Sequence, residues 1–242
     1  MHALSSRGGV AGQLRLFAVP PTSPRDIDVH AVSQPARQFT GDFYFTHREG
    51  SVLWIVLGDV AGKGLEAAVI MAMIQEQLEE RLVACVRAST DPANTMTRLH
   101  LALRELLPGN RFATAVIAQI HDDGRLVVTN AGHCPLLIAR RNGSIETIGS
   151  TGPVIGILPS AHWRSIELPF RRGDALLAYT DGVIEAGVGN GEELGLCRLQ
   201  ETFAAAAAQA TRSRDIAAAI ESMLDSFASR REDDVTFVVA RR

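Results

Sequence analysis

The stretch Phe112–Gly132, FATAVIAQIHDDGRLVVTNAG, indicates how this chain folds. Two runs rich in β-branched residues flank HDDG at 121–124, a sequence typical of a hairpin turn. The following segment, PLLIARRNGSIETI, repeats this pattern with Asn-Gly at 142–143. Strands joined by such short turns pair antiparallel, because parallel pairing needs a long crossover connection. The stretch therefore argues against a doubly wound, parallel nucleotide-binding sheet.

The segments on either side extend this pattern into a layered fold. Further strands are expected at 27–34, 38–46, 51–59, 162–170, 174–182 and 233–241. Helices are expected at two places between Gly64 and Leu107, and again at 196–210 and 216–227. The second helix should begin at Asp91, a plausible N-cap, with Pro92 in its first turn. We predict an α+β fold in which helices cover antiparallel sheet.

Length and composition fit one soluble globular domain. The chain has 242 residues, of which 46% are hydrophobic and 21% are charged. Residues 1–26 are rich in Gly, Ser and Pro and are predicted to form a tether or linker. We find no internal repeat and no second boundary, so residues 27–242 are predicted to form a single domain.

Charge and cysteine content argue against several classes of protein. A formal net charge of -3 gives no general reason to expect nucleic acid or a membrane surface as a partner. The three cysteines are scattered without a CxxC pair, so neither a disulfide framework nor a zinc site is expected. The apolar runs are shorter than the roughly 18–20 residues that span a bilayer, and the N-terminus lacks an apolar signal region. We therefore expect a cytoplasmic protein.

The segment Val56–Ala72, VLGDVAGKGLEAAVIMA, is the first candidate for chemistry. Glycines beside a lysine, between a strand and a helix, suggest a phosphate-binding loop. A Walker A loop, however, needs four residues before its Gly-Lys and a Ser or Thr after it. Here only three residues separate Gly58 from the Gly62-Lys63 pair, and Gly64 stands where the Ser or Thr would be. With the P-loop excluded, Asp59 becomes the candidate functional residue.

Aspartates recur at the ends of apolar strands: Asp42, Asp59, Asp181, Asp233 and Asp234. Half-buried carboxylates that converge repel one another unless cations compensate them. Oxygen ligands without His or Cys favour Mg²⁺ or Mn²⁺, and two such ions can activate water against a phosphoryl group. Each aspartate alone has an ordinary alternative as a helix cap, a turn residue or a solvated side chain.

Six motifs together resemble a known family. GDFYF, LGDVAGKGLEAAVIMA, NAGHCPLLI, GPVIGILP, YTDGVIEA and DDVTFVV occur in the order found in PPM metal-dependent protein serine/threonine phosphatases, specifically the bacterial SpoIIE-like branch. The match runs from about Val32 to Arg241. It implies an α-β-β-α sandwich of two antiparallel sheets flanked by helices. It also implies that residues 27–242 are one PPM-type phosphatase domain.

The resemblance implies a site for two or more Mn²⁺ or Mg²⁺ ions. Asp59 should bridge the metals and the Val60 carbonyl should bind one of them. Asp181 and Asp233 should complete the other site, so that Asp59, Asp181 and Asp233 form the catalytic set.

Other residues near these motifs have more open roles. Asp42 should lie near the first ligands, in direct contact with metal or through water, and Asp234 is either a ligand or a neighbour that orients one. Lys63 contacts phosphate or lies in solvent at the turn into the helix. His133 invites a role as a general acid, but a histidine in such a turn more often positions a loop, and we favour that role for it and for Cys134.

The function implied by the resemblance is hydrolysis of phosphoserine or phosphothreonine in a protein by a metal-activated water. The implied substrate is a phosphorylated STAS-type anti-anti-sigma regulator, and a homodimer remains open. Thr40 and Phe45 depart from the usual Gly-Gly-Asp-Phe-Tyr-Asp pattern, and Phe45 removes a carboxylate. They support the alternative of a catalytically weak, partner-binding switch module. A third reading is a metal-dependent phosphohydrolase of small molecules.

Overall fold

The computed structural model describes residues 27–36, 40–61, 80–88, 91–106, 111–227 and 232–242. The predicted tether at 1–26, Lys63 and most of the helix expected after Gly64 lie outside these residues. Residues 80–88 are helical, as expected for the end of that helix.

The described strands form two five-stranded sheets in which every neighbouring pair is antiparallel. The first, called here the β10 sheet, has the order β1 (Asp28–Gln34), β10 (Val235–Arg241), β9 (Ala175–Tyr179), β6 (Leu136–Ala139) and β7 (Ile145–Ile148). The second, the β3 sheet, has the order β2 (Asp42–Glu49), β3 (Val52–Val60), β4 (Ala113–His121), β5 (Arg125–Ala131) and β8 (Ile166–Pro169).

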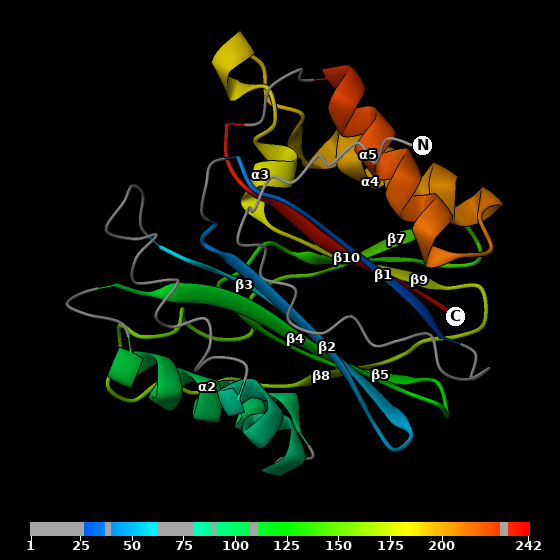
Figure 1. The fold of residues 1–242 in the computed structure, drawn as a ribbon. Helices are drawn as coiled ribbons and strands as arrows, with labels where there is room; N and C mark the ends of the chain where they lie inside the picture. Colours follow the sequence, from blue (N-terminus) through cyan, green and yellow to red (C-terminus); the bar gives the residue numbers. More distant parts are fainter. Residues whose placement is uncertain (1–26, 37–39, 62–79, 89–90, 107–110, 228–231) are drawn as a thin grey trace, which may run out of the picture.

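Helices cover the outer face of each sheet (Figure 1). The β3 sheet carries α2 (Pro92–Leu106) and the helical residues 80–88. The β10 sheet carries α3 (Asp181–Ile184), α4 (Gly195–Gln209) and α5 (Ser213–Phe227), with the short 3₁₀ helix η1 (Val188–Asn190) beside them. The predicted α-β-β-α sandwich is confirmed.

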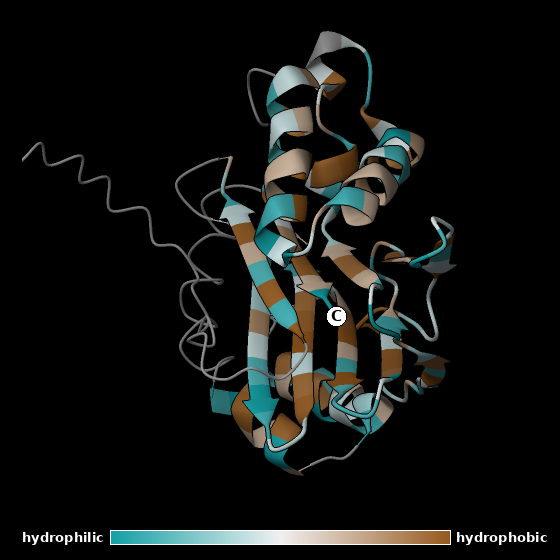
Figure 2. Cartoon of the chain, turned by 90° about the vertical axis from the view of Figure 1, so that its right-hand side faces the viewer, coloured by the Kyte–Doolittle hydropathy of each residue, from teal (hydrophilic) through white to brown (hydrophobic). Residues whose placement is uncertain are grey.

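The alternation of side chains along each strand explains the layers. On β3, Leu53, Ile55 and Leu57 face the β10 sheet, whereas Trp54 and Val56 face α2. Both faces are apolar because each is covered, one by a sheet and the other by helices. Hydrophobic bands on the strands and on the helices that cover them are visible in Figure 2.

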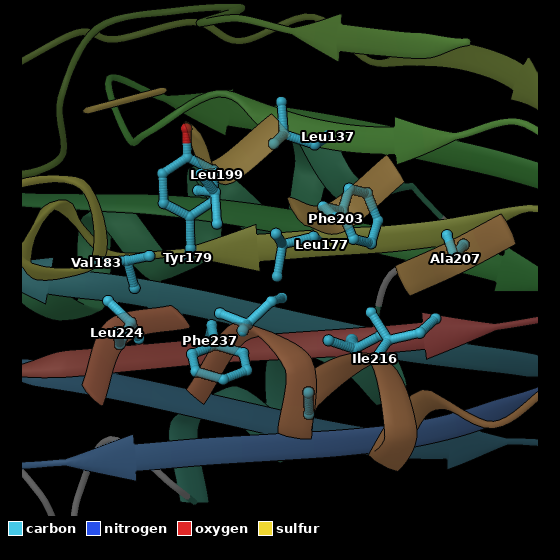
Figure 3. Packing of buried hydrophobic residues seen from close by; sticks show 14 of the residues in the cluster. Leu137, Leu177, Tyr179, Val183, Leu199, Phe203, Ala207, Ile216, Leu224 and Phe237 are labelled. Carbon is cyan, nitrogen blue, oxygen red and sulfur yellow. The ribbon is translucent and has the colours of Figure 1, made fainter. Parts of the chain in front are cut away.

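The outer layer of the β10 sheet is built in the same way. Figure 3 shows Phe203 of α4 and Ile216 of α5 directed at the sheet, where they meet Leu177 and Phe237. All four side chains are fully buried. Burying a side chain of this size stabilises the fold by about 1.5–3 kcal/mol.

The start of α2 confirms the predicted cap. The backbone N–H of Asn94 donates to the Asp91 carboxylate at 3.3 Å, and Thr95 N–H donates to the Asp91 carbonyl at 3.0 Å. Pro92 has no N–H to satisfy and is therefore well suited to the first helical position.

The sandwich gathers several strand ends at one edge. The end of β3, the start of β2, the end of β9 and the residues before β6 and β10 all contribute to one cleft there. The helices that the structure describes are too short or too polar to cross a membrane.

Candidate metal centre

A cleft of about 400 Å³ lies at this edge of the sandwich. It brings together five carboxylates that are far apart in the sequence: Asp59, Asp181, Glu185, Asp233 and Asp234. Its remaining lining residues are Gly41, Val60, Ala61, Phe112, Thr114, Gly132, His133 and Cys134. None of these residues is a lysine or an arginine, so the cleft is strongly acidic.

The β3 sheet places Asp59 at the mouth of the cleft. Asp59 lies near the end of β3, opposite Asp42 on β2 and Thr114 on β4. Gly41 packs so closely that a Cβ atom there would lie 2.8 Å from Asp59 Oδ1 and 3.2 Å from the Val60 carbonyl oxygen. Glycine at position 41 therefore leaves room for both oxygens that the sequence assigns to metal.

A second glycine brings Asp181 and Asp233 together. Asp181 opens α3 directly after β9, and Gly182 follows it. A Cβ atom on Gly182 would lie 2.0 Å from the Asp234 carbonyl oxygen, so only glycine allows this turn to approach the Asp233-Asp234 backbone. The Asp-Gly step thus places two predicted ligands on one wall of the cleft.

The carboxylates perturb one another electrostatically. Burial, followed by the negative charges of Asp181, Asp233 and Asp234, raises the pKa of Asp59 to about 7. Burial and the same negative field raise the pKa of the Cys134 thiol to about 12. The cleft therefore resists further negative charge and is suited to binding cations.

Asp42 on β2 is the strand partner of Asp59 on β3, but it does not line the cleft. It is 4% exposed, and its carboxylate accepts a hydrogen bond from the Thr180 hydroxyl at 2.9 Å. The Thr180 hydroxyl in turn accepts Thr236 N–H at 3.1 Å. Burial raises the pKa of Asp42 well above its usual value, and the neighbouring Asp59 charge adds to this shift. Asp42 is thus positioned to influence the metal centre through Asp59.

Both carboxylate oxygens of Asp234 accept hydrogen bonds from backbone N–H groups. One carboxylate oxygen accepts Ala36 N–H at 2.8 Å and the other accepts Gly41 N–H at 3.0 Å. Both donors belong to the connection between β1 and β2. These bonds support the orienting role for Asp234, because they hold both of its oxygens against the connection between β1 and β2.

The donor set fits a divalent cation of the Mg²⁺ or Mn²⁺ type. Oxygen ligands predominate, and His133, the one imidazole among the described lining residues, is buried and hydrogen-bonded. Within the described residues, no three acidic side chains lie close enough together to hold one metal ion in their present positions. Carboxylates gathered in this way repel one another, and a bound cation would compensate them.

His133 is part of a structural network. Burial lowers its pKa to about 4, so the imidazole is neutral near pH 7. Its Nδ1 lies 2.8 Å from Thr114 Oγ1, and its backbone N–H donates to Asn130 Oδ1 at 2.8 Å. The Asn130 amide also donates to the carbonyls of His133 and Cys134. These bonds support the positioning role that the sequence favoured over general acid catalysis.

The two departures from the family pattern have local explanations. Thr40 Oγ1 accepts the backbone N–H of Asp42 at 3.0 Å, so the hydroxyl stabilises the entry into β2. Phe45 is 1% exposed and packs in the cluster that faces α2. Alternation along β2 places Asp42 on the opposite face. The expectation that Phe45 removes a carboxylate from the site is therefore wrong, because position 45 faces away from the cleft.

Sequence reasoning missed several contributors to this site. Glu185 lines the cleft four residues after Asp181, and this spacing on a helical turn was an available signal. Thr180 and Asn130 are fully buried polar residues that hold Asp42 and the 131–134 loop. The local sequence around Thr180 did not indicate its distant partner Asp42. Asn130 bonds His133 and Cys134, three and four residues further along the chain, so its role was open to prediction from the sequence.

The chain was compared with known proteins. Residues 49–242 match the family model described as stage II sporulation protein E (SpoIIE). Protein IcfG of Synechocystis sp. is 31% identical over 216 residues, which cover 78% of this chain and 34% of IcfG. Phosphoserine phosphatase RsbU of Bacillus subtilis is 26% identical and is matched over 89% of this chain and 63% of RsbU. The chain thus spans about a third of one relative and less than two thirds of the other.

A solved structure agrees with the architecture. The SiaA-PP2C domain of Pseudomonas aeruginosa superposes with a TM-score of 0.76 at 21% identity, over 88% of this chain and 85% of that domain. This likeness establishes the fold. The family match covers most of the chain, including β3, the end of β9 and β10. The chain therefore belongs to the SpoIIE family, whose PPM-type sandwich it adopts.

Proposed function

We propose that this chain is a metal-dependent protein phosphatase that hydrolyses phosphoserine or phosphothreonine. The observation that carries the proposal is the acidic cleft, which Asp59, Asp181 and Asp233 line with no lysine or arginine among its described lining residues. Membership of the SpoIIE family and similarity to RsbU, whose name is phosphoserine phosphatase, support the same activity.

The proposed roles follow the predicted site. Asp59, Asp181, Asp233 and the Val60 carbonyl would hold two or more Mn²⁺ or Mg²⁺ ions. When bound, such ions lower the pKa of water and stabilise charge on a transferring phosphoryl group. Asp234 would fix the Gly41 wall by accepting its N–H. Thr180 would hold Asp42 behind Asp59.

The proposed substrate is a phosphorylated regulator of a partner-switching system, specifically a STAS-domain protein. This step rests on the family and on RsbU rather than on any contact seen in the cleft.

The test measures phosphate release from a phosphorylated STAS-domain protein, with and without Mn²⁺ and with EDTA as a control. p-Nitrophenyl phosphate serves as the small-molecule comparison. We expect release from the protein only with metal, and faster than from the small molecule. Metal-dependent turnover of the small molecule alone would favour the small-molecule phosphohydrolase. Stable binding of the STAS protein without turnover would favour the switch module, whose support from Phe45 is lost.

A further inference from the structure

A second groove lies at the other end of the β10 sheet. Its volume is about 870 Å³, and it is formed where the β6–β7 turn meets the β8–β9 turn. Its lining residues are Arg140, Arg141, Asn142, Glu146, Leu168, Pro169, Arg171, Arg172 and Asp174. Four of these residues are arginines and two are acids, so this groove has the opposite charge to the cleft that holds Asp59.

Two strands show how far apart the groove and the cleft lie. Asp174 in the groove directly precedes β9, and Asp181 in the cleft follows that strand closely. Likewise, Arg140 in the groove directly follows β6, and Cys134 in the cleft lies just before the start of that strand. At about 3.3 Å per residue, the two sites are roughly 20 Å apart along β9. The groove is therefore separate from the proposed phosphatase site.

The groove has a rigid base. Asp174 is buried, and its carboxylate accepts Arg140 Nη1 at 2.8 Å, Arg141 N–H at 3.1 Å and Arg171 N–H at 2.9 Å. Arg140 is further paired with Glu146. The two acids thus neutralise Arg140 and fix both turns, and the remaining arginines give the groove its positive charge.

Arg141 and Arg171 present this charge to solvent. Both side chains are exposed, and neither guanidinium has an ion-pair partner in the part of the chain that the structure describes. The aliphatic stem of Arg141 lies against Gly173, where a Cβ atom would come within 3.0 Å of Arg141 Cδ. This contact holds the Arg141 side chain at the groove and reduces the entropy lost when a ligand binds.

We propose that this groove, called here the arginine groove, docks an acidic, Asp/Glu-rich segment of a partner protein. Guanidinium groups bind carboxylates through paired hydrogen bonds. The exposed arginine charges therefore steer such a segment to the groove.

The geometry favours a polypeptide over a small phosphate ligand. The backbone N–H groups of Arg141 and Arg171 already donate to Asp174, so they cannot form an anion-binding nest. No aromatic ring lines the groove to stack on a nucleobase. An open groove with exposed arginines beside Leu168 and Pro169 suits an extended acidic chain that also makes apolar contacts.

The test measures binding of a fluorescein-labelled decaglutamate peptide by fluorescence anisotropy at low salt, with decaglutamine as the neutral peptide. The variant Arg141→Gln/Arg171→Gln removes two of the three exposed arginine charges and leaves Asp174 unchanged. The matched control, Arg87→Gln/Arg98→Gln, removes two exposed charges from the helices over the β3 sheet. We expect the groove variant to bind about tenfold more weakly, a loss of about 1.4 kcal/mol, and the control to bind within about twofold of wild type.

Binding of decaglutamate should also weaken as NaCl rises from about 50 to 200 mM, since exposed charges are screened. Melting temperatures verify that both variants are folded. Equal weakening in the two variants, or no saturable binding to the wild type, would show that the groove is not a docking site. If inorganic tripolyphosphate binds more tightly than decaglutamate, and loses this binding in the groove variant, the groove is a small-anion site and the proposal is wrong.

Discussion

At the scale of single residues, Asp59 has the most demanding environment in the proposed metal centre. It is largely buried, and three other aspartates oppose its ionisation. A group in this setting destabilises the metal-free fold at neutral pH and becomes favourable only when cations bind. Function and stability should therefore respond to its replacement in opposite directions.

We predict that Asp59→Asn lowers Mn²⁺-dependent phosphate release by about 10³-fold or more, because the carboxylate that would hold the proposed ions is lost. Steady-state kinetics over a range of Mn²⁺ concentrations measures the effect. The matched control is Asp123→Asn in the exposed turn between β4 and β5. An Asp59→Asn protein with near-native turnover would refute the assignment of Asp59 to the metal centre.

The same residue predicts how the stability of the metal-free protein depends on pH. The pKa of Asp59 is about 7 in the folded protein and near 3.8 when it is unperturbed. Between these values the folded state retains a proton that the unfolded state releases, so stability falls as pH rises from about 4 to 7. Asp59→Asn removes this loss.

In EDTA, we therefore expect Asp59→Asn to melt higher than the wild type at pH 8, by on the order of 5 °C. The difference should shrink towards zero near pH 4. Melting curves followed by circular dichroism at several pH values give the comparison. A constant difference across this range would mean that Asp59 is not the group that titrates.

Single residues also show what the sequence could and could not predict. Asp59, Asp181 and Asp233 were identifiable because each stands where an apolar strand begins or ends. Thr180 was not, since its partner Asp42 lies 138 residues away in the sequence and is brought close only by the packing of separate strands. The side chain of Phe45 was misjudged because the alternation of side chains along a strand, which places positions 42 and 45 on opposite faces, was not applied to the motif.

At the scale of elements, the connection between β1 and β2 depends on the segment before β10. Asp234 accepts N–H groups from Ala36 and Gly41, and Gly41 in turn forms the wall beside Asp59. Val60 N–H also donates to the Gly41 carbonyl at 3.1 Å. Asp234 therefore couples three segments that meet at the cleft.

We predict that Asp234→Ala lowers kcat/KM about tenfold and speeds amide hydrogen exchange at Ala36 and Gly41, because both donors lose their acceptor. Exchange in the middle of β10 should be unchanged and serves as the internal control. Mn²⁺ affinity should fall much less than in Asp59→Asn. If instead Mn²⁺ affinity is lost while exchange at Gly41 stays slow, Asp234 is a metal ligand.

Elements were easier to predict than their arrangement. Hairpin turns and the Asp91 cap are local signals, and the structure contains both. The division of the strands into two sheets is not local. β1 pairs with β10, which lies at the other end of the chain. β8 pairs with β5, although β6 and β7 lie between these two strands in the sequence. These pairings depend on burying two apolar faces together.

At the scale of the whole molecule, the two sheets share one apolar layer. Leu57 of β3 is fully buried in this layer, together with Leu176 of β9 and Val238 of β10. Both tryptophans, Trp54 and Trp163, lie instead in the cluster between the β3 sheet and α2. Tryptophan fluorescence therefore reports on one side of the sandwich, whereas far-UV circular dichroism reports on all of it.

We predict that Leu57→Ala lowers the free energy of unfolding by about 2–5 kcal/mol, because it leaves a cavity in the layer that both sheets share. The control, Leu101→Ala, changes a side chain that is 53% exposed on α2 and should cost less than about 0.5 kcal/mol. Urea unfolding followed by both probes should give coincident transitions for the wild type and for each variant, since residues 27–242 are predicted to unfold as one domain. Two separated transitions, with fluorescence changing at lower urea than circular dichroism, would show that the two layers unfold independently.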